Sequence, residues 1–284
     1  MSDSTHNSFI LIDGVALALY DWPLPLRVRP RAVVLIVHGL GEHAGRYVAL
    51  AQRLNDWGFC VRAYDQRGHG ESNGARGVLA ADNILLQDLG EVLRETRAQL
   101  SQPWSCPLIL LGHSMGGLVA AALVERQPSA VDALVLSSPA LDLGLGAWQK
   151  FMLSLRYRLA PDLTLSSRLD PSKISHAPAV FEAYRNDELV HRRVSARLLR
   201  FMERAGARVL AAAPNWRTPT LLLYAGADEL VRPAGSRAFA AAAPGHQVRS
   251  HCFEQMYHEV FNETDPSDVY AALIVWLDQL IPRR

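Results

Sequence analysis

A serine between two glycines follows a run of bulky apolar residues and precedes a segment rich in Ala, Leu and Val. The stretch reads Leu108–Leu111, then Gly112-His113-Ser114-Met115-Gly116. An unbroken apolar run is typical of a strand buried on both faces, and small residues after it favour a helix. Because glycine lacks a Cβ, strand and helix can approach closely and hold the serine in a strained turn. The pattern predicts an exposed nucleophile at Ser114.

A serine hydroxyl becomes strongly nucleophilic when a neighbouring imidazole removes its proton. The chain has ten histidines, so position must select the base. His258 follows the strand-like run Val248–Phe253, and Asp228 follows the run Thr220–Tyr224. In a parallel sheet both would lie at the same edge as Ser114. The order Ser114, Asp228, His258 is also the order found in hydrolases with this serine turn.

These positions predict a division of roles. His258 would act as general base and then general acid, while Asp228 would hold its tautomer. The backbone N–H groups of Met115 and Leu40 would bind the developing oxyanion. Asp142 remains the alternative acid, because it lies just after another predicted strand.

Charged residues beside these motifs leave further questions open. Asp65, Arg67 and His69 are interpreted as a buried polar network that braces the site. Glu42 is a candidate substrate contact, and bracing of the oxyanion loop is its alternative role. The spacing of His, Cys and Asp residues matches no metal site, so we expect neither a metal nor another cofactor.

Composition narrows the class of protein. The 284 residues are 49% hydrophobic and carry a formal net charge of +1, which argues against nucleic acid as a partner. The three cysteines are far apart in the sequence and predict reduced thiols. The N-terminal residues lack a signal-peptide pattern, and no apolar run reaches the ~20 residues of a membrane span. We expect a cytoplasmic protein.

The order of predicted elements indicates one α/β unit with an insertion. Strand-like and helical patterns alternate as far as residue 140, which predicts a parallel sheet flanked by helices. Residues 141–215 read as helical, are richer in Arg and lack a strand-like run. The sheet pattern then returns. We therefore expect an α/β core at 1–140 and 216–284 and a helical cap at 141–215.

Several motifs together resemble the monoacylglycerol lipase and lysophospholipase group of the α/β-hydrolase superfamily. They are His38-Gly39-Leu40-Gly41-Glu42-His43, Tyr64-Asp65-Gln66-Arg67-Gly68-His69-Gly70-Glu71-Ser72, Gly112-His113-Ser114-Met115-Gly116-Gly117, Gly226-Ala227-Asp228 and Tyr257-His258-Glu259. The resemblance implies an eight-stranded, mostly parallel sheet, carboxyl-ester hydrolysis without a cofactor, and a helical cap over the acyl site. It places the triad at Ser114, Asp228 and His258.

Within the cap, apolar residues recur at helical spacing. Trp148, Phe151, Met152, Leu155 and Leu159 form one stripe. The stripe either packs on the core and lines the acyl pocket or faces outward and contacts a lipid surface. Trp148, Phe151, Met152 and Leu155 are our candidate substrate contacts, and a transient membrane contact through the cap is the alternative that stays open.

We therefore expect a serine hydrolase that cleaves a small acyl-ester or lipid substrate, namely monoacylglycerol, through an acyl-enzyme on Ser114. A short-chain carboxylesterase and a lysophospholipase are the enzyme alternatives. A proline-releasing aminopeptidase is disfavoured because the cap shows no acidic pair that would clearly hold an amine. A non-catalytic binding protein of this fold is disfavoured because all three triad positions are filled.

Overall fold

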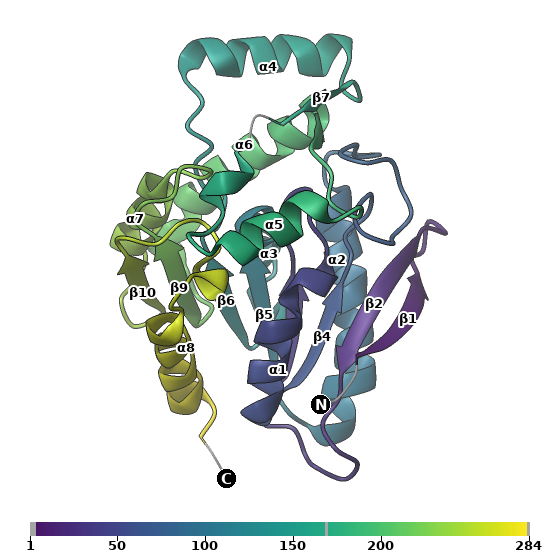
Figure 1. Ribbon diagram of the computed structural model, residues 1–284, viewed down its shortest axis with the longest axis vertical. Coiled ribbons are helices and arrows are strands. Elements are labelled where there is room, and N and C mark those ends of the chain that lie inside the picture. Colours follow the sequence, from purple (N-terminus) through teal and green to yellow (C-terminus); the bar gives the residue numbers. More distant parts are fainter. Residues whose placement is uncertain (1–3, 168–169, 283–284) are drawn as a thin grey trace.

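A single sheet of eight strands organises the computed structural model, which describes residues 4–167 and 170–282 (Figure 1). The strand order is β1-β2-β4-β3-β5-β6-β9-β10. The strands are β1 Thr5–Ile10, β2 Ala16–Trp22, β3 Val33–Val37, β4 Cys60–Tyr64, β5 Leu108–His113, β6 Ala133–Ser137, β9 Thr220–Ala225 and β10 Val248–Phe253. Strand β2 is antiparallel to β1 and β4, and the other pairs are parallel. The predicted mostly parallel, eight-stranded sheet is confirmed.

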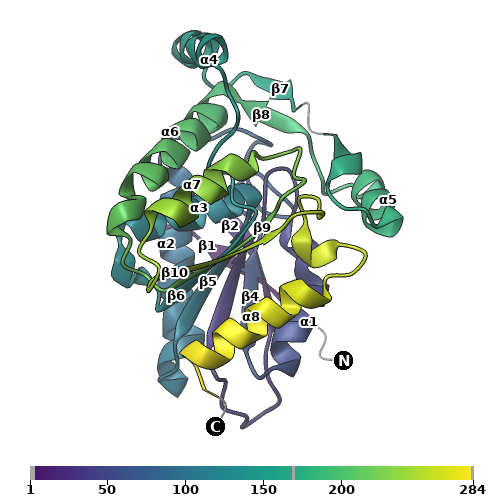
Figure 2. The same ribbon diagram turned by 90° about the vertical axis from the view of Figure 1, so that its left-hand side faces the viewer.

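Helices cover both faces of this sheet (Figure 2). They are α1 Val48–Asp56, α2 Ile84–Thr96, α3 Ser114–Arg126, α7 Pro233–Ala242 and α8 Ser267–Leu280. Alternate residues of β3 enter the two opposite cores: Leu35 packs with α2 and α3, and Ile36 packs with α1 and α8. All five β3 residues are therefore buried, which explains their unbroken apolar run.

The cap contains α4 Ala147–Leu159, α5 Pro178–Asn186 and α6 Ala196–Ala212, with β7 Thr164–Ser166 paired to β8 Arg193–Ser195. We expected no strand in this segment, and that expectation is wrong. Three-residue strands are too short to leave a periodic pattern, and β7 is mostly exposed. Helix α6 packs against α3 and contributes Phe201 and Met202 to the core. The limits of the core and cap stay a prediction.

Residues 1–3 and 283–284 of the predicted core and residues 168–169 of the predicted cap lie outside the described part of the chain. Within residues 4–167 and 170–282, no helix is both long enough and apolar enough to cross a membrane.

The turn between β5 and α3 depends on close backbone approach. Ser114 has φ of +53°, in the left-handed region that non-glycine residues rarely adopt. A Cβ on Gly116 would lie 2.2 Å from the Val37 carbonyl oxygen and 2.3 Å from that of His38. Only a glycine at 116 lets α3 start this close to the end of β3. The turn and the neighbouring strand end therefore fix each other.

Replacing Gly116 by alanine should force these backbones apart. We expect Gly116→Ala to lower the free energy of unfolding by about 3 kcal/mol, because an added carbon in a packed interior cannot be accommodated without displacement. Urea-induced unfolding, monitored by circular dichroism, measures this change in the free energy of unfolding.

Gly90→Ala is the matched control. Gly90 lies inside α2, and a Cβ there meets no atom within 4 Å. Alanine should raise the unfolding free energy by about 0.5–1 kcal/mol by restricting the unfolded chain. Equal effects of the two substitutions would contradict the close-packed turn.

Candidate active site

Ser114 stands where β5 ends and α3 begins. Its side chain lines a cavity beyond the carboxyl ends of the parallel strands, where ligands bind in sheets of this type. Met115 is the second residue of α3, so its N–H has no acceptor inside the helix and lies at the positive end of the helix dipole. This arrangement offers a donor beside the serine.

Asp228 and His258 form a buried pair. Asp228 Oδ2 lies 2.6 Å from His258 Nδ1, while Asp228 Oδ1 accepts hydrogen bonds from the N–H groups of Leu230 and Val231 at 2.8 and 2.9 Å. Burial raises the pKa of Asp228, but the His258 charge and these hydrogen bonds outweigh burial, and the pKa lies below its ordinary value. The aspartate is therefore an ionised acceptor that holds the ring through Nδ1.

The alternative acid does not reach the histidine. In the described chain Asp142 Oδ1 accepts a hydrogen bond from the Gly144 N–H at 2.8 Å, and it is Asp228 that pairs with His258. The structure thus brings together Ser114, His258 and Asp228 and leaves Asp142 in its own turn.

The electrostatic surroundings favour a protonated His258. Burial lowers the pKa of this imidazole, but Asp228, Glu259 and Glu42 outweigh burial and raise it above its ordinary value. The His113 ring lies 4.7 Å from His258, and burial together with His258 lowers the pKa of His113 to about 3. His113 is therefore neutral at neutral pH and does not repel a protonated His258.

Among the described residues, no hydrogen bond joins Ser114 Oγ to His258, although both side chains line the same cavity. Such bonds are often long in an unliganded enzyme and shorten when substrate binds.

Glu42 folds the loop that carries Leu40 against the serine. Its Oε1 accepts hydrogen bonds from the Gly39 N–H and the Tyr47 hydroxyl. A Cβ on Gly39 would lie 3.1 Å from Ser114 Cβ, so the loop touches the serine directly. Glu42 also lines the cavity. The structure thus supports the bracing role and also places Glu42 at the wall of the cavity.

A second network holds the loops around the site. Asp65 accepts hydrogen bonds from the N–H groups of Ala44 and Glu71 at 2.7 and 2.8 Å. Arg67 forms a two-pronged ion pair with buried Asp88, both contacts at 2.8 Å. The predicted buried network around Asp65 and Arg67 is confirmed.

The cavity has a volume of about 430 Å³ and a mostly apolar lining. Six of its apolar lining residues are Leu143, Leu145, Leu165, Val194, Leu199 and Met202. These come from the segment after β6, from β7 and β8, and from α6. Sequence reasoning missed them, although the amphipathic pattern of α6 was a signal that could have pointed to Leu199 and Met202.

The predicted cap contacts lie elsewhere. Trp148, Phe151 and Leu155 are 70%, 58% and 41% exposed, and neither they nor Met152 line the cavity among the described residues. These positions do not support the expectation that they contact substrate, which stays a prediction. Helix α4 buries its opposite side through Leu153, so the stripe faces outward at the end of the molecule farthest from the chain termini (Figure 1).

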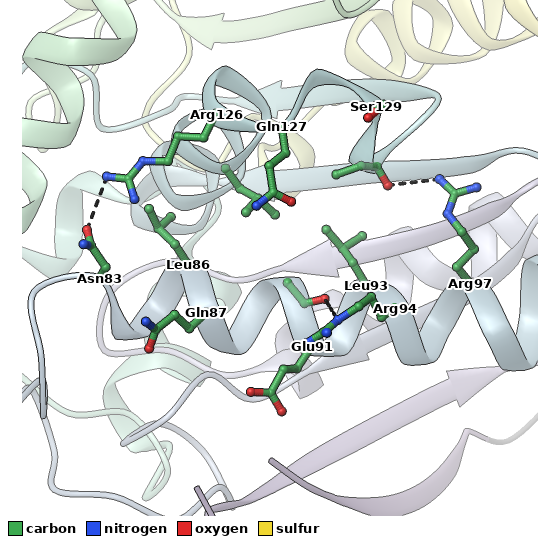
Figure 3. A pocket seen from close by; sticks show the side chains of 13 residues that line it. Asn83, Leu86, Gln87, Glu91, Leu93, Arg94, Arg97, Arg126, Gln127 and Ser129 are labelled. Carbon is green, nitrogen blue, oxygen red and sulfur yellow. Dashed lines mark hydrogen bonds between the residues drawn. The ribbon is translucent and has the colours of Figure 1, made fainter. Parts of the chain in front are cut away.

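A larger hollow of about 620 Å³ lies between α2 and the end of α3 (Figure 3). Arg94, Arg97 and Arg126 line it, and none of its described lining residues is a histidine. The hollow thus lacks an imidazole that could activate its one described serine, Ser129. Within the described chain, no three His, Cys, Asp or Glu side chains are grouped so that they could hold a metal ion. The smaller cavity at Ser114 is therefore the candidate active site.

Comparison with known proteins places this chain in a family. Residues 28–265 match the family described as serine aminopeptidase, S33. The chain is 34% identical to a monoacylglycerol lipase of Mycolicibacterium smegmatis, over 97% of this chain and 98% of the relative. It is also 30% identical to an uncharacterized abhydrolase domain-containing protein of Dictyostelium discoideum. That match covers 98% of this chain but only 29% of the relative.

A solved structure adds the fold. The crystal structure of the Paleococcus ferrophilus monoacylglycerol lipase superposes with a TM-score of 0.83 at 31% identity, covering 93% of this chain and 99% of that one. The chain belongs to the serine aminopeptidase S33 family of the α/β-hydrolase superfamily.

Proposed function

We propose that this carboxylic ester hydrolase cleaves monoacylglycerol to glycerol and a fatty acid, with Ser114 as nucleophile. The observation that carries the proposal is the Asp228–His258 pair, 2.6 Å apart. His258 lines the same cavity as Ser114, and the mostly apolar lining of this cavity suits an acyl chain. The two relatives with lipase names support the substrate class.

In the first half-reaction, His258 Nε2 takes the proton of Ser114 Oγ as Oγ bonds to the ester carbonyl carbon. The carbonyl oxygen becomes an oxyanion, which the N–H groups of Leu40 and Met115 bind. When the intermediate collapses, the ester C–O bond breaks and His258 gives its proton to the leaving glycerol oxygen. Asp228 stabilises the imidazolium that exists between these two transfers.

In the second half-reaction, water replaces the alcohol. His258 removes a proton from the water while the water oxygen attacks the acyl carbon on Ser114. As the acyl–Oγ bond then breaks, His258 passes this proton to Ser114 Oγ. The free carboxylic acid leaves, and no group other than substrate and water is consumed. The reaction therefore needs no cofactor.

Charge in the cavity argues against a free amine as substrate. An amine-binding site would need carboxylates with unneutralised charge. Glu42 and Glu259 both line the cavity, but Arg46 lies 3.2 Å from Glu42 and 2.7 Å from Glu259. The guanidinium pairs with both carboxylates and offsets one of their two negative charges, so neither carboxylate is left unpaired for an amine, which favours an uncharged head group. Arg192, at the same cavity, favours lysophospholipids as a second candidate substrate.

Helix α4 extends the proposal to a membrane surface. Trp148 and Phe151 are stacked with ring centroids 5.5 Å apart and are mostly exposed. Lys150, Arg156 and Arg158 occur on the same helix. Exposed aromatic rings flanked by cations suit binding at an anionic lipid interface. A helix so placed would bring the cap, and the cavity below it, to the substrate.

Fatty-acid release from 1-monooleoylglycerol tests the proposed substrate directly. We expect release by the wild type and its loss in Ser114→Ala by about 10⁴-fold or more in kcat. Hydrolysis of p-nitrophenyl butyrate alone would reject the lipase assignment and retain the serine hydrolase. Release of fatty acid from a lysophospholipid in preference to the monoglyceride would move the assignment to the second candidate.

The pH profile tests the acid–base pair. Because the pKa of His258 is raised, the neutral base is lost as pH falls, and we expect kcat/KM to fall with a midpoint above the ordinary value of about 6.5. Asp228→Asn should lower kcat about 10⁴-fold and move this midpoint downward.

Asp142→Asn is the matched control, because that carboxylate also follows a sheet strand but serves only its own turn. We expect its kcat and pH profile to equal those of the wild type. Loss of activity in Asp142→Asn with little effect of Asp228→Asn would overturn the assignment of the acid.

The role of α4 is tested with Trp148→Asp plus Phe151→Asp. Activity on monooleoylglycerol in anionic vesicles should fall, while hydrolysis of dispersed p-nitrophenyl butyrate should stay unchanged, because the two rings lie outside the cavity. Val275→Asp, an exposed apolar residue of α8, controls for added charge. Unchanged vesicle activity in the double variant would remove the membrane contact.

A further inference from the structure

The loops that carry His258 and Asp228 both touch one short segment of the cap, Lys173–His176, which we call the cap tether. It begins at the last residue of the 3-10 turn Pro171–Lys173 and ends just before α5, Pro178–Asn186. In Figure 2 the yellow loop after β10 approaches the side of the cap that carries α5. Every residue of the tether contacts one of these two loops.

Two of these contacts concern the residues next to the proposed acid and base. The Lys173 ammonium lies 2.7 Å from a carboxylate oxygen of Glu229, the neighbour of Asp228. The Ile174 carbonyl accepts a hydrogen bond from the Glu259 N–H at 2.7 Å. Since Glu259 follows His258, the cap holds the backbone directly after the base.

The preceding side of His258 is held as well. Tyr257 stacks on the His176 ring of the tether, with centroids 3.7 Å apart and planes 21° from parallel. Ser175 Oγ donates a hydrogen bond to the Asn262 carbonyl at 2.8 Å. The loop 257–263 is thus fastened to the cap on both sides of the imidazole.

Glu263 is the hub of these contacts. Its Oε1 accepts hydrogen bonds from the Tyr257 N–H at 2.7 Å and from His176 Nδ1 at 2.9 Å. Its Oε2 accepts from the N–H groups of His176 and Thr264, both at 3.2 Å. The carboxylate side chain is only 3% exposed. A buried carboxylate with four donors is strongly ordered, and removal of its charge leaves those donors unsatisfied.

We propose that Glu263 is a positioning residue that fastens the cap tether to the loop of the general base, so that the cap sets the orientation of His258 as well as covering the cavity. The inference rests on the proposed role of His258. It predicts that the contacts of Glu263 with the cap tether control the rate of the chemical steps, because small displacements of a catalytic group have large effects on rate.

The test is the pH dependence of p-nitrophenyl butyrate hydrolysis by Glu263→Gln. A glutamine amide turns one acceptor into a donor that opposes the N–H groups of Tyr257 or His176. We expect kcat to fall about 10- to 100-fold, with KM within about twofold. The acid-side midpoint should move to lower pH, because a displaced imidazole loses part of the stabilisation from Asp228, Glu259 and Glu42. His113 is neutral and adds no charge there.

The route through the cap is tested by a double-mutant cycle with His176→Ala. If Glu263 acts through the tether, the double variant should be no slower than Glu263→Gln alone, because the partner of His176 is already lost. Additive effects on kcat would overturn the cap route. If Glu263→Gln does not fold, Glu263→Asp replaces it, since its shorter carboxylate keeps the charge but misses the four donors.

Asp21→Asn is the matched control for lost stability. Asp21 is a buried carboxylate that binds Arg62 through two hydrogen bonds of 2.6 and 2.7 Å, between β2 and β4 and outside the site. This variant should unfold at lower temperature yet keep the wild-type pH midpoint and kcat per folded molecule.

Ser114→Ala, assayed in parallel, distinguishes a failure of the proposed function from a failure of the proposed role of Glu263. An active Ser114→Ala would reject the proposed function. An inactive Ser114→Ala beside a Glu263→Gln variant with wild-type kcat and pH midpoint would reject only the role of Glu263.

Discussion

The strained backbone at Ser114 is the constraint on which the rest of the site depends. A positive φ at a non-glycine residue costs free energy and persists only where the surroundings enforce it. Here the enforcement comes from α3, which starts against the carbonyl groups at the end of β3, with no room for a side chain at Gly116. Because β3 and β5 are neighbours in the sheet, the loop with Leu40 must lie beside the serine. One tight turn therefore places both the proposed nucleophile and the proposed oxyanion donors.

Buried ion pairs also hold the loops around the cavity in place. Arg46 bridges Glu42 and Glu259, and thereby joins the oxyanion loop to the residue after His258. Breaking a buried pair by removing one partner costs several kcal/mol, so Arg46 holds the two loops against each other. Glu263 is a second buried carboxylate that joins two segments. It binds the Tyr257 N–H, directly before His258, and His176 of the cap. The base is thus held by the core and by the cap at once.

The core and the triad pattern could be predicted from the sequence, because their signals are local. Strands such as β3 are buried on both faces and leave an unbroken apolar run, and the turn at Ser114 needs glycines at fixed spacing. The cap could not be predicted in the same way. Its strands have three residues each, and the outward direction of Trp148 and Phe151 is set by packing of Leu153 on the opposite side of α4. The hub at Glu263 joins residues 87 positions apart, which no local pattern reveals.

The central claim is that His258 and Asp228 activate Ser114 as a nucleophile. The most direct measurement is covalent labelling by a fluorophosphonate, with the modified residue located by mass spectrometry of peptides. We expect one label per chain, on Ser114, and a labelling rate that collapses in His258→Ala while that variant remains folded. A label on another residue, or an unchanged rate in His258→Ala, would contradict it.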